Sequence, residues 1–229
     1  MKIGLIFAED EELDSVKSKM IINNEISIYN LKIYECNYKS SSCYLVKCGV
    51  GKVNAARTTQ ILISNFNVDC IINMGVAGSI SKDINKCDVV IASKLVQYDF
   101  DLTRFGREKG FVPNTGKYFE SDIKLLDVAK KIKCDENIFV GIIASGDAFV
   151  SSLDIGKMIN KEFNALCVEM EGASIAQVCC LANIPFLVIR SISDSLYDKD
   201  NHSSFEEFLV KSSIVGSKIL FELLDNYIG

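Results

Sequence analysis

The sequence contains little of several residue types on which common enzyme sites depend. Its 229 residues include one histidine, two prolines and four arginines. Because His202 is the only histidine and no C-x-x-C pair occurs, the paired ligand spacing of a zinc site is missing. A Ser-His-Asp triad would have to use His202, and no G-x-S-x-G elbow is present. These absences argue against a metal site and against serine-hydrolase chemistry.

Long apolar runs and flexible linkers are also missing. No segment reaches the roughly 18 consecutive apolar residues that a transmembrane helix requires, and none is rich in proline, glycine and serine. We therefore expect a single domain over residues 1–229 that does not contact a membrane. The formal net charge of −5 argues against a nucleic-acid partner, because phosphate binding needs a basic face.

Cysteine, by contrast, is abundant, with nine residues. The number is odd, and most of these cysteines alternate with valine, isoleucine or leucine. A strand-like segment follows Met1 directly, so we expect no secretory leader. We interpret the cysteines as small apolar core residues in a reducing cytoplasm, and we expect neither a metal nor a cofactor.

Short apolar runs alternate with segments of helical period, which predicts an α/β fold. Residues 98–121 form a long irregular segment, and such loops in compact domains tend to be functional. The predicted strands cover residues 2–8, 33–38, 43–48, 68–74, 88–96, 137–144, 165–170 and 186–189. The predicted helices cover residues 53–66, 172–183 and 205–227, the last with Ser204 as its N-cap.

The most informative stretch is residues 165–194, which predicts a strand, a helix and a second strand. Glu169 and Glu171 stand at the end of the first strand, and Arg190 and Asp194 follow the second. Ligands of α/β sheets bind at the carboxyl ends of the strands. We therefore expect two consecutive strands to bring these four side chains to one edge.

Other predicted strand ends add candidates to this edge. The acidic run at residues 9–12 opens a helix, where the dipole stabilises negative charge, although one carboxylate could turn back into a cleft. The G-V-G-K segment at residues 49–52 is incomplete as a phosphate loop, so a tight turn near a ligand is favoured. Residues 75–79 predict a glycine turn that cradles a sugar or base, or an ordinary loop. Phe149, in S-G-D-A-F-V, is either a stacking platform or a core residue.

Carboxylates gathered in this way suit the cleavage of an N-glycosidic bond. They can accept hydrogen bonds from sugar hydroxyls, activate a water and donate a proton to a leaving group. The sugar becomes cation-like in the transition state, so nearby negative charge stabilises it.

Motifs spread along the chain resemble one family. The 5′-methylthioadenosine/S-adenosylhomocysteine nucleosidases of the nucleoside phosphorylase superfamily are similar to this sequence nearly end to end, and V-E-M-E followed by I-R-S-I-S-D is the most specific pair. The resemblance implies a three-layer α/β sandwich with helices on both sides of a mixed central β-sheet. It also implies an adenine nucleoside substrate and a homodimer. The matching segments are KIGLIFAEDEE, CGVGKVNAA, IINMGVAG, YDFD, FG, SGDAF, VEMEG, IPFLVIRSISD and SFEEFL.

The resemblance implies catalytic roles for four residues. Asp194 corresponds to the general acid aimed at N7 of adenine, and Ser193 would hold its carboxyl group. Glu12 would bind and activate the attacking water, with Arg190 beside it.

It also implies substrate contacts. Glu171 would bind the ribose hydroxyls and Met170 would pack on the sugar. Phe149 would stack on adenine, while the backbone of Val150 would read the base edge. The other implied binding residues are Val50, Val76, Ala77, Gly78, Leu102, Phe105, Pro113 and Glu169.

Several of these positions carry further expectations. Val50, Phe105 and Pro113 match a 5′-substituent pocket that the partner subunit completes in the family. Val76 replaces a serine that is common among relatives, which removes a hydroxyl near the water, and Leu102 replaces a common valine near the 5′ pocket.

For Glu169 a structural role is favoured over a catalytic one. A buried carboxylate needs a partner, and Arg190 could neutralise it.

Two alternatives remain open from the sequence. A purine nucleoside phosphorylase of the same fold would need converging cations for phosphate, yet Asn73 stands where such enzymes carry an arginine, and Glu12 would repel phosphate. A non-catalytic nucleoside sensor would have kept the pocket and lost turnover, although all three key acids are present. Hydrolysis is favoured; the choice among methylthioadenosine, S-adenosylhomocysteine, 5′-deoxyadenosine and an adenine-bearing futalosine stays open.

Overall fold

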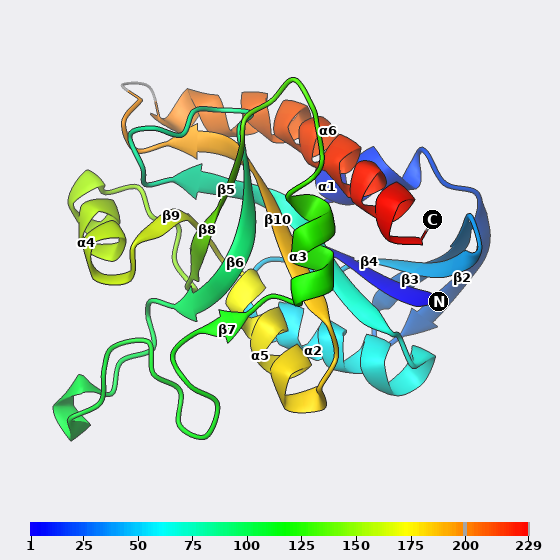
Figure 1. The fold of residues 1–229 in the computed structure, drawn as a ribbon, viewed down its shortest axis with the longest axis horizontal. Helices are drawn as coiled ribbons and strands as arrows, with labels where there is room; N and C mark the ends of the chain where they lie inside the picture. Colours follow the sequence, from blue (N-terminus) through cyan, green and yellow to red (C-terminus); the bar gives the residue numbers. More distant parts are fainter. Residues whose placement is uncertain (199–200, 229) are drawn as a thin grey trace.

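The computed structural model describes residues 1–198 and 201–228, without the side chains of residues 201–207. Over this part of the chain, ten strands form one mixed β-sheet (Figure 1). The strands are β1 (Lys2–Phe7), β2 (Ile22–Ile28), β3 (Leu31–Tyr38), β4 (Ser41–Lys47), β5 (Cys70–Ser79), β6 (Val89–Gln97), β7 (Phe119–Glu120), β8 (Ile138–Ser145), β9 (Ala165–Glu169) and β10 (Phe186–Ser195). The helices are α1 (Asp10–Lys17), α2 (Lys52–Ile61), α3 (Ile123–Ala129), α4 (Leu153–Phe163), α5 (Gly172–Ala182) and α6 (Asn201–Ile228), with a π-helical segment η1 (Leu62–Phe66) and a short 3₁₀ helix η2 (Thr103–Phe105).

Part of the sheet closes into a ring. Strand β5 pairs in parallel with β10, and β10 pairs antiparallel with β6. Strand β6 then pairs with β8 and β8 with β9, and β9 returns to β5. The other long strands continue from β5 in the order β1, β4, β3 and β2. The mixed sheet confirms the predicted fold class, whereas the ring was not predicted, because pairing between distant segments leaves no local pattern.

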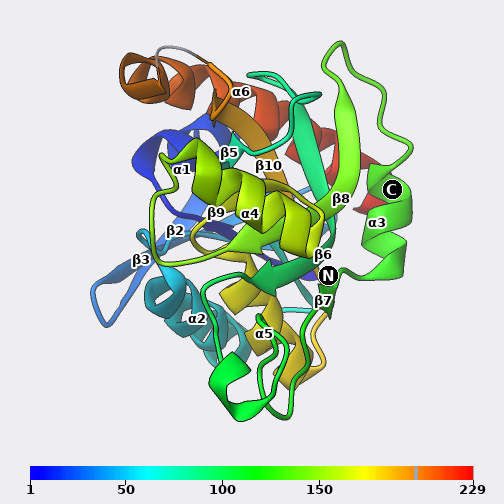
Figure 2. The same ribbon diagram turned by 90° about the vertical axis from the view of Figure 1, so that its left-hand side faces the viewer.

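Helices cover both faces of the sheet, and each face has a hydrophobic core of its own. Helices α1, α3 and α6 pack against strand residues such as Leu5 and Ile189, while α2 and α5 pack against Ile6 and Val188. Figure 1 shows α1 and α6 above the sheet and α2 and α5 below it, and Figure 2 shows α4 beside β9. Side chains alternate between the faces of a strand, and residues 3–7 of β1 and 186–189 of β10 are apolar because both faces are buried along these runs.

Three sequence predictions need correction. Residues 75–79, predicted as a glycine turn, continue β5, because they pair with residues 190–195 of β10. Helices α3 and α4 were not among the predicted helices. The last helix begins at Asn201, before the predicted cap Ser204; the side chains of Ser204 and His202 lie outside the described residues.

The predictions for cysteines and membrane contact can also be compared with the structure. All nine cysteines are free, and most are buried as predicted, but Cys134 and Cys180 are exposed. In the described part of the chain, no helix combines the length and the apolar character that crossing a membrane requires.

Candidate active site

A cavity of about 330 Å³ lies at the carboxyl ends of several strands. Its polar wall includes Glu12 from α1, Glu171 from the turn after β9, and Asp194 from β10. These elements are distant in the sequence, and the parallel pairing of β1, β5 and β10 brings them to one edge. This is the edge at which ligands of α/β sheets bind.

Most of the residues that the sequence pointed to meet at this cavity. Val150 lines a small adjoining cavity of about 30 Å³, and Arg190 is buried behind the wall with 1% of its surface exposed. The cavity is lined by Glu12, Val50, Val76, Ala77, Gly78, Phe149, Glu169, Met170, Glu171, Ser193 and Asp194. Leu102, Phe105 and Pro113 lie instead on the segment between β6 and β7, which projects from the body of the molecule in Figure 1.

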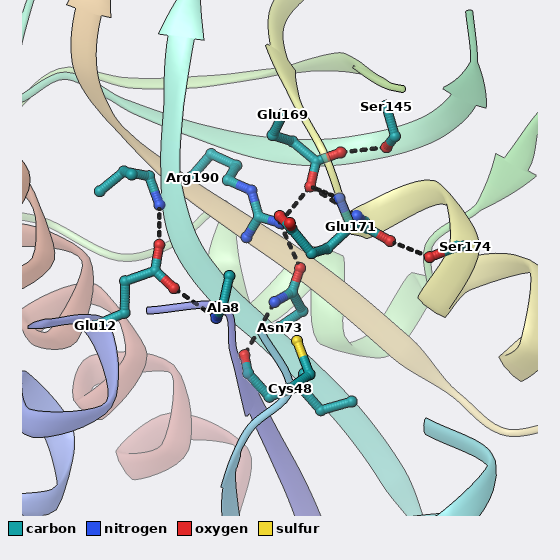
Figure 3. A network of polar contacts seen from close by, with 12 residues as sticks. Ala8, Glu12, Cys48, Asn73, Ser145, Glu169, Glu171, Ser174 and Arg190 are labelled. Carbon is teal, nitrogen blue, oxygen red and sulfur yellow. Dashed lines mark hydrogen bonds and ion pairs between the residues drawn. The ribbon is translucent and has the colours of Figure 1, made fainter. Parts of the chain in front are cut away.

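The carboxylate of Glu12 turns back from the first turn of α1 to the strand ends (Figure 3). One oxygen accepts hydrogen bonds from the amides of Ala8 and Glu9, at 2.7 and 3.2 Å, and the other accepts from the amide of Val76 at 2.9 Å. Burial raises the pKa of Glu12, while Arg190 and these amides lower it, and the net direction is upward. Since Val76 donates through its backbone, the contact does not require the hydroxyl that is common at this position.

Two glycines of β5 allow side chains to approach the strand closely. A Cβ atom on Gly75 would lie 2.8 Å from Oε1 of Glu12 and 2.9 Å from Nη1 of Arg190. A Cβ atom on Gly78 would lie 2.8 Å from Oδ2 of Asp194. These glycines therefore provide space for the charged groups, rather than forming the predicted turn.

Asp194 stands near the end of β10 and is held by its neighbour. Ser193 Oγ donates a hydrogen bond to Oδ1 of Asp194 at 2.8 Å, and both residues line the cavity. Burial raises the pKa of Asp194, opposed by the Ser193 hydrogen bond and by the positive charge of Lys86. The raised pKa favours retention of a proton, as a general acid requires.

Glu169 is the centre of a buried polar network (Figure 3). Its Oε1 accepts a hydrogen bond from the Ser145 hydroxyl, and its Oε2 accepts from the guanidinium of Arg190. The same Oε2 accepts from the amides of Glu171 and Gly172, at 3.1 and 2.6 Å. Both carboxylate oxygens are thus engaged by the protein, which agrees with the structural role favoured for Glu169.

Arg190 connects this network to the neighbouring strand. Its Nη2 donates to Oδ1 of Asn73 at 2.6 Å and lies 3.7 Å from Oε2 of Glu171. Asn73 in turn donates to the carbonyl of Ile6 at 2.9 Å. Burial alone would lower the pKa of Arg190, but Glu169, Glu171 and Glu12 raise it, and the net direction is upward. The guanidinium therefore remains charged and partly balances the acids around it.

Glu171, in the cavity wall, has a strongly perturbed carboxyl group. Its Oε1 accepts a hydrogen bond from the amide of Gly51 at 2.9 Å. Burial, followed by the negative charge of Glu169, raises its pKa to about 8, although Arg190 and the Gly51 amide lower it. At neutral pH this raised pKa favours the protonated form of Glu171.

Part of the cavity wall is apolar. Phe149 keeps 56% of its surface exposed, so its interpretation as a core residue is wrong. Val50, Val76 and Met170 also line the cavity. An exposed aromatic face beside carboxylates suits a flat ring joined to a polyhydroxylated group.

Sequence reasoning missed several residues that shape the site. Ala8, Glu9 and Val168 line the cavity, and their positions at the ends of β1 and β9 were the available signal. Two further residues contact the lining residues and not the cavity itself. The Ser145 hydroxyl donates a hydrogen bond to Glu169, and the Gly51 amide donates one to Glu171. Gly51 was predicted to bring backbone close to a ligand, and in the structure its amide contacts a side chain of the cavity wall.

Comparison with known proteins agrees with this arrangement. The model of the phosphorylase superfamily matches residues 2–225. A 5′-methylthioadenosine/S-adenosylhomocysteine nucleosidase of Staphylococcus aureus strain MRSA252 is 38% identical over 225 residues, which cover 97% of this chain and 98% of that protein. The Helicobacter pylori nucleosidase of the same name superposes with a TM-score of 0.94 at 36% identity, covering 98% of each chain. The futalosine hydrolase of H. pylori strain 26695 gives a TM-score of 0.94 at 34% identity, covering 98% of this chain and 97% of that one. The chain therefore belongs to the phosphorylase superfamily and, within it, to the family of 5′-methylthioadenosine/S-adenosylhomocysteine nucleosidases.

Proposed function

We propose that the cavity binds an adenine nucleoside with a 5′-thio substituent and that this site hydrolyses its N-glycosidic bond. The chain is an N-glycosyl hydrolase, as its relatives of 36–38% identity are nucleosidases for 5′-methylthioadenosine and S-adenosylhomocysteine. The observation that carries the assignment to this site is the pairing of Glu12 and Asp194. Both are buried carboxyl groups with raised pKa values, they come from different elements, and they line one cavity.

In this proposal Asp194 protonates the leaving group. The bond between C1′ and N9 breaks, its electron pair passes to the base, and N7 of adenine takes the proton of Asp194. Ser193 holds Oδ1 of Asp194, which leaves Oδ2, close to Gly78, for the base. Phe149 provides the stacking face for adenine, and the backbone of Val150 contacts its edge.

Glu12 and Glu171 act on the sugar side. Glu12 accepts a proton from water as the water oxygen bonds to C1′, and its negative charge stabilises the cation-like sugar. Glu171 binds the ribose hydroxyls, and Met170 packs on the ring. Arg190 and Glu169 hold this acidic side together through their buried ion pair. The products are free adenine and the 5′-thio-substituted ribose.

We expect hydrolysis rather than phosphorolysis. Asn73 is committed to Arg190 and to the carbonyl of Ile6, and the carboxylate of Glu12 occupies the wall near Gly75, so an incoming phosphate would meet negative charge. With 5′-methylthioadenosine in phosphate buffer, chromatography should detect adenine and free 5-methylthioribose, at the same rate as in a phosphate-free buffer. Sugar 1-phosphate as the main product would identify a phosphorylase, and binding without adenine release would identify a sensor.

The identity of the 5′ group needs a comparison of substrates. The 34% identity with a futalosine hydrolase gives a specific reason to include a futalosine-type nucleoside bearing adenine. Adenine release should be measured for this compound, 5′-methylthioadenosine, S-adenosylhomocysteine and 5′-deoxyadenosine. We expect the highest kcat/KM for a 5′-thio nucleoside.

We also propose that the active unit is a homodimer. Phe105 is 79% exposed on the projecting segment, and neither it nor Pro113 lines the cavity of its own chain. Both side chains are therefore free to complete the 5′ pocket of a partner subunit. Analytical ultracentrifugation at assay concentration should give the molecular mass of two chains. Phe105→Asp should shift this mass towards that of one chain and raise KM for 5′-methylthioadenosine. A fully active monomer would contradict the shared pocket.

The single-domain and cytoplasmic predictions are retained as proposals. The single domain is supported by the pairing of β10 with β5, which joins the two halves of the chain. The cytoplasmic location is supported by nine free cysteines, since reducing compartments keep thiols unpaired.

A further inference from the structure

A closed ring of contacts lies next to the cavity and involves none of the residues assigned above. Asp99, in the Y-D-F-D motif after β6, accepts a bond from the ammonium of Lys52 at 2.7 Å through Oδ1. Its other oxygen accepts from the amide of Asp147 at 3.0 Å. Oδ1 of Asp147 then accepts from the amide of Lys52 at 2.8 Å. Three residues, one at the start of α2 and two in the loops after β6 and β8, thus hold one another.

Two of these residues stand next to segments that form part of the cavity wall. Lys52 follows Val50 and Gly51 in the sequence. Val50 lines the cavity, and the amide of Gly51 donates a hydrogen bond to Glu171. Asp147 lies two residues before Phe149, the exposed aromatic of the same wall. Asp99 contacts both residues, so it joins these two parts of the cavity wall together with the direct bond between Lys52 and Asp147.

The ring is well placed to resist motion of these loops. The side chains of Lys52 and Asp99 are only 17% and 29% exposed, so solvent competes with this pair less than with a more exposed pair such as Lys32 and Glu25. Lys52 also donates to Oε1 of Gln97 at 3.1 Å. The Asp147 carboxylate satisfies an amide at the start of α2 that has no partner within the helix.

We propose that Asp99, with Lys52 and Asp147, is a positioning residue that sets the affinity for the nucleoside without touching it. The inference rests on the proposed function of the cavity. Glu171 and Phe149 would contact the ribose and the base in the ground state and in the transition state alike. If these two side chains are held less firmly, the substrate and the transition state lose the same amount of binding free energy. KM then rises and kcat stays nearly unchanged. The proposed acid and the proposed base, Asp194 and Glu12, stand on β10 and α1, outside the ring of contacts.

The test variant is Asp99→Asn. Asp99 accepts with both oxygens, and an amide has one acceptor, so either Lys52 or the amide of Asp147 loses its partner. The matched control is Asp101→Asn in the same motif, since Asp101 accepts both of its contacts from Thr103 through Oδ1 alone, and an asparagine can keep both.

Steady-state adenine release from 5′-methylthioadenosine should show KM raised at least about tenfold in Asp99→Asn, with kcat within about threefold of wild type. Lys52→Met should raise KM in the same way. The double variant Lys52→Met/Asp99→Asn should have no higher KM than either single variant, because each substitution already disrupts the same ring of contacts. Asp101→Asn should match wild type.

Unchanged KM in Asp99→Asn, a fall in kcat alone, or an equal rise in KM in the control would overturn the proposal. Melting curves should establish whether Asp99→Asn remains folded, and calorimetry should measure the binding of a non-hydrolysable nucleoside analogue. If Asp99→Asn loses stability, Lys52→Met is the variant on which the proposal is tested. Failure of the wild type to release adenine would instead count against the proposed function.

Discussion

Asp194→Asn should lower kcat for adenine release at least about 10²-fold, the low end of general acid catalysis. The asparagine keeps the size of the side chain, and its oxygen can keep the hydrogen bond from Ser193. Its amide can donate a hydrogen bond to N7 but cannot transfer a proton. Substrate binding should therefore be largely retained while turnover is lost, which separates this variant from Asp99→Asn.

The pKa of Asp194 determines what fraction of the enzyme carries the proton that the leaving group needs. An aspartate with a pKa of about 3.9 is protonated in only about one molecule in a thousand at pH 7, which would add roughly 4 kcal/mol to the barrier. Burial raises the pKa of Asp194 and so increases the protonated fraction. Because the acid must carry its proton, activity is lost as the pH rises above this raised pKa, unless proton transfer follows the growing basicity of N7 in the transition state.

The measurement pairs steady-state kinetics with calorimetric binding of a non-hydrolysable analogue. Ser193→Ala is the graded comparison, since it removes one hydrogen bond worth roughly 1 kcal/mol, which should lower kcat about fivefold. If kcat of a folded Asp194→Asn variant changes by less than about threefold, Asp194 is not the acid. Glu169→Gln would then be the next variant to test.

Glu12→Gln should have a comparable effect, with kcat reduced about 10²- to 10⁴-fold. The amide is a far weaker base for water and lacks the negative charge that stabilises the cation-like sugar. It also has one acceptor oxygen, whereas Glu12 uses both oxygens for the amides of Ala8, Glu9 and Val76. One buried amide is left unpaired, so the free energy of unfolding should fall by about 1–3 kcal/mol.

The pH profile distinguishes loss of the base from loss of stability. Glu12 must be ionised to accept the proton of water, and burial raises its pKa, so kcat/KM of the wild type should fall as the pH drops through a value above the ordinary range of glutamate. This acidic limb should be absent in Glu12→Gln at temperatures at which the variant is folded. Glu11→Gln is the matched control, since Glu11 is exposed in the same turn. An unchanged acidic limb in Glu12→Gln would assign it to another group.

Local patterns predicted the parts of the molecule that depend on burial. The continuous apolar runs of β1 and β10 identified strands with two buried faces, and the residues that follow them identified the polar side of the cavity. Helix α4 was missed because apolar residues such as Ile155 and Met158 remain 45% and 47% exposed, so its pattern differs from that of a core helix. The strand at Gly75–Gly78 was missed because glycine usually signals a turn, whereas here it makes room for carboxylates.

The contacts that support the site could not be predicted from spacing. Ser145 and Glu169 are joined only because β8 and β9 are neighbours. The contact between Asn73 and Arg190 follows in the same way from the pairing of β5 with β10. The motifs named the acids themselves, and only the three-dimensional pairing of strands defines their partners.

The closed part of the sheet has a consequence for how the enzyme is made. The strand that closes the ring, β10, pairs Phe186 with Ile71, so the ribosome must synthesise about half of the chain between the two partners. Until β10 emerges, β5 lacks this neighbour, and the nascent chain has neither Arg190 nor Asp194. Such distant strand pairs slow folding, since loop closure precedes the stabilising contacts. The arginine that neutralises Glu169 and Glu171 is therefore carried by the last strand of the sheet to be synthesised.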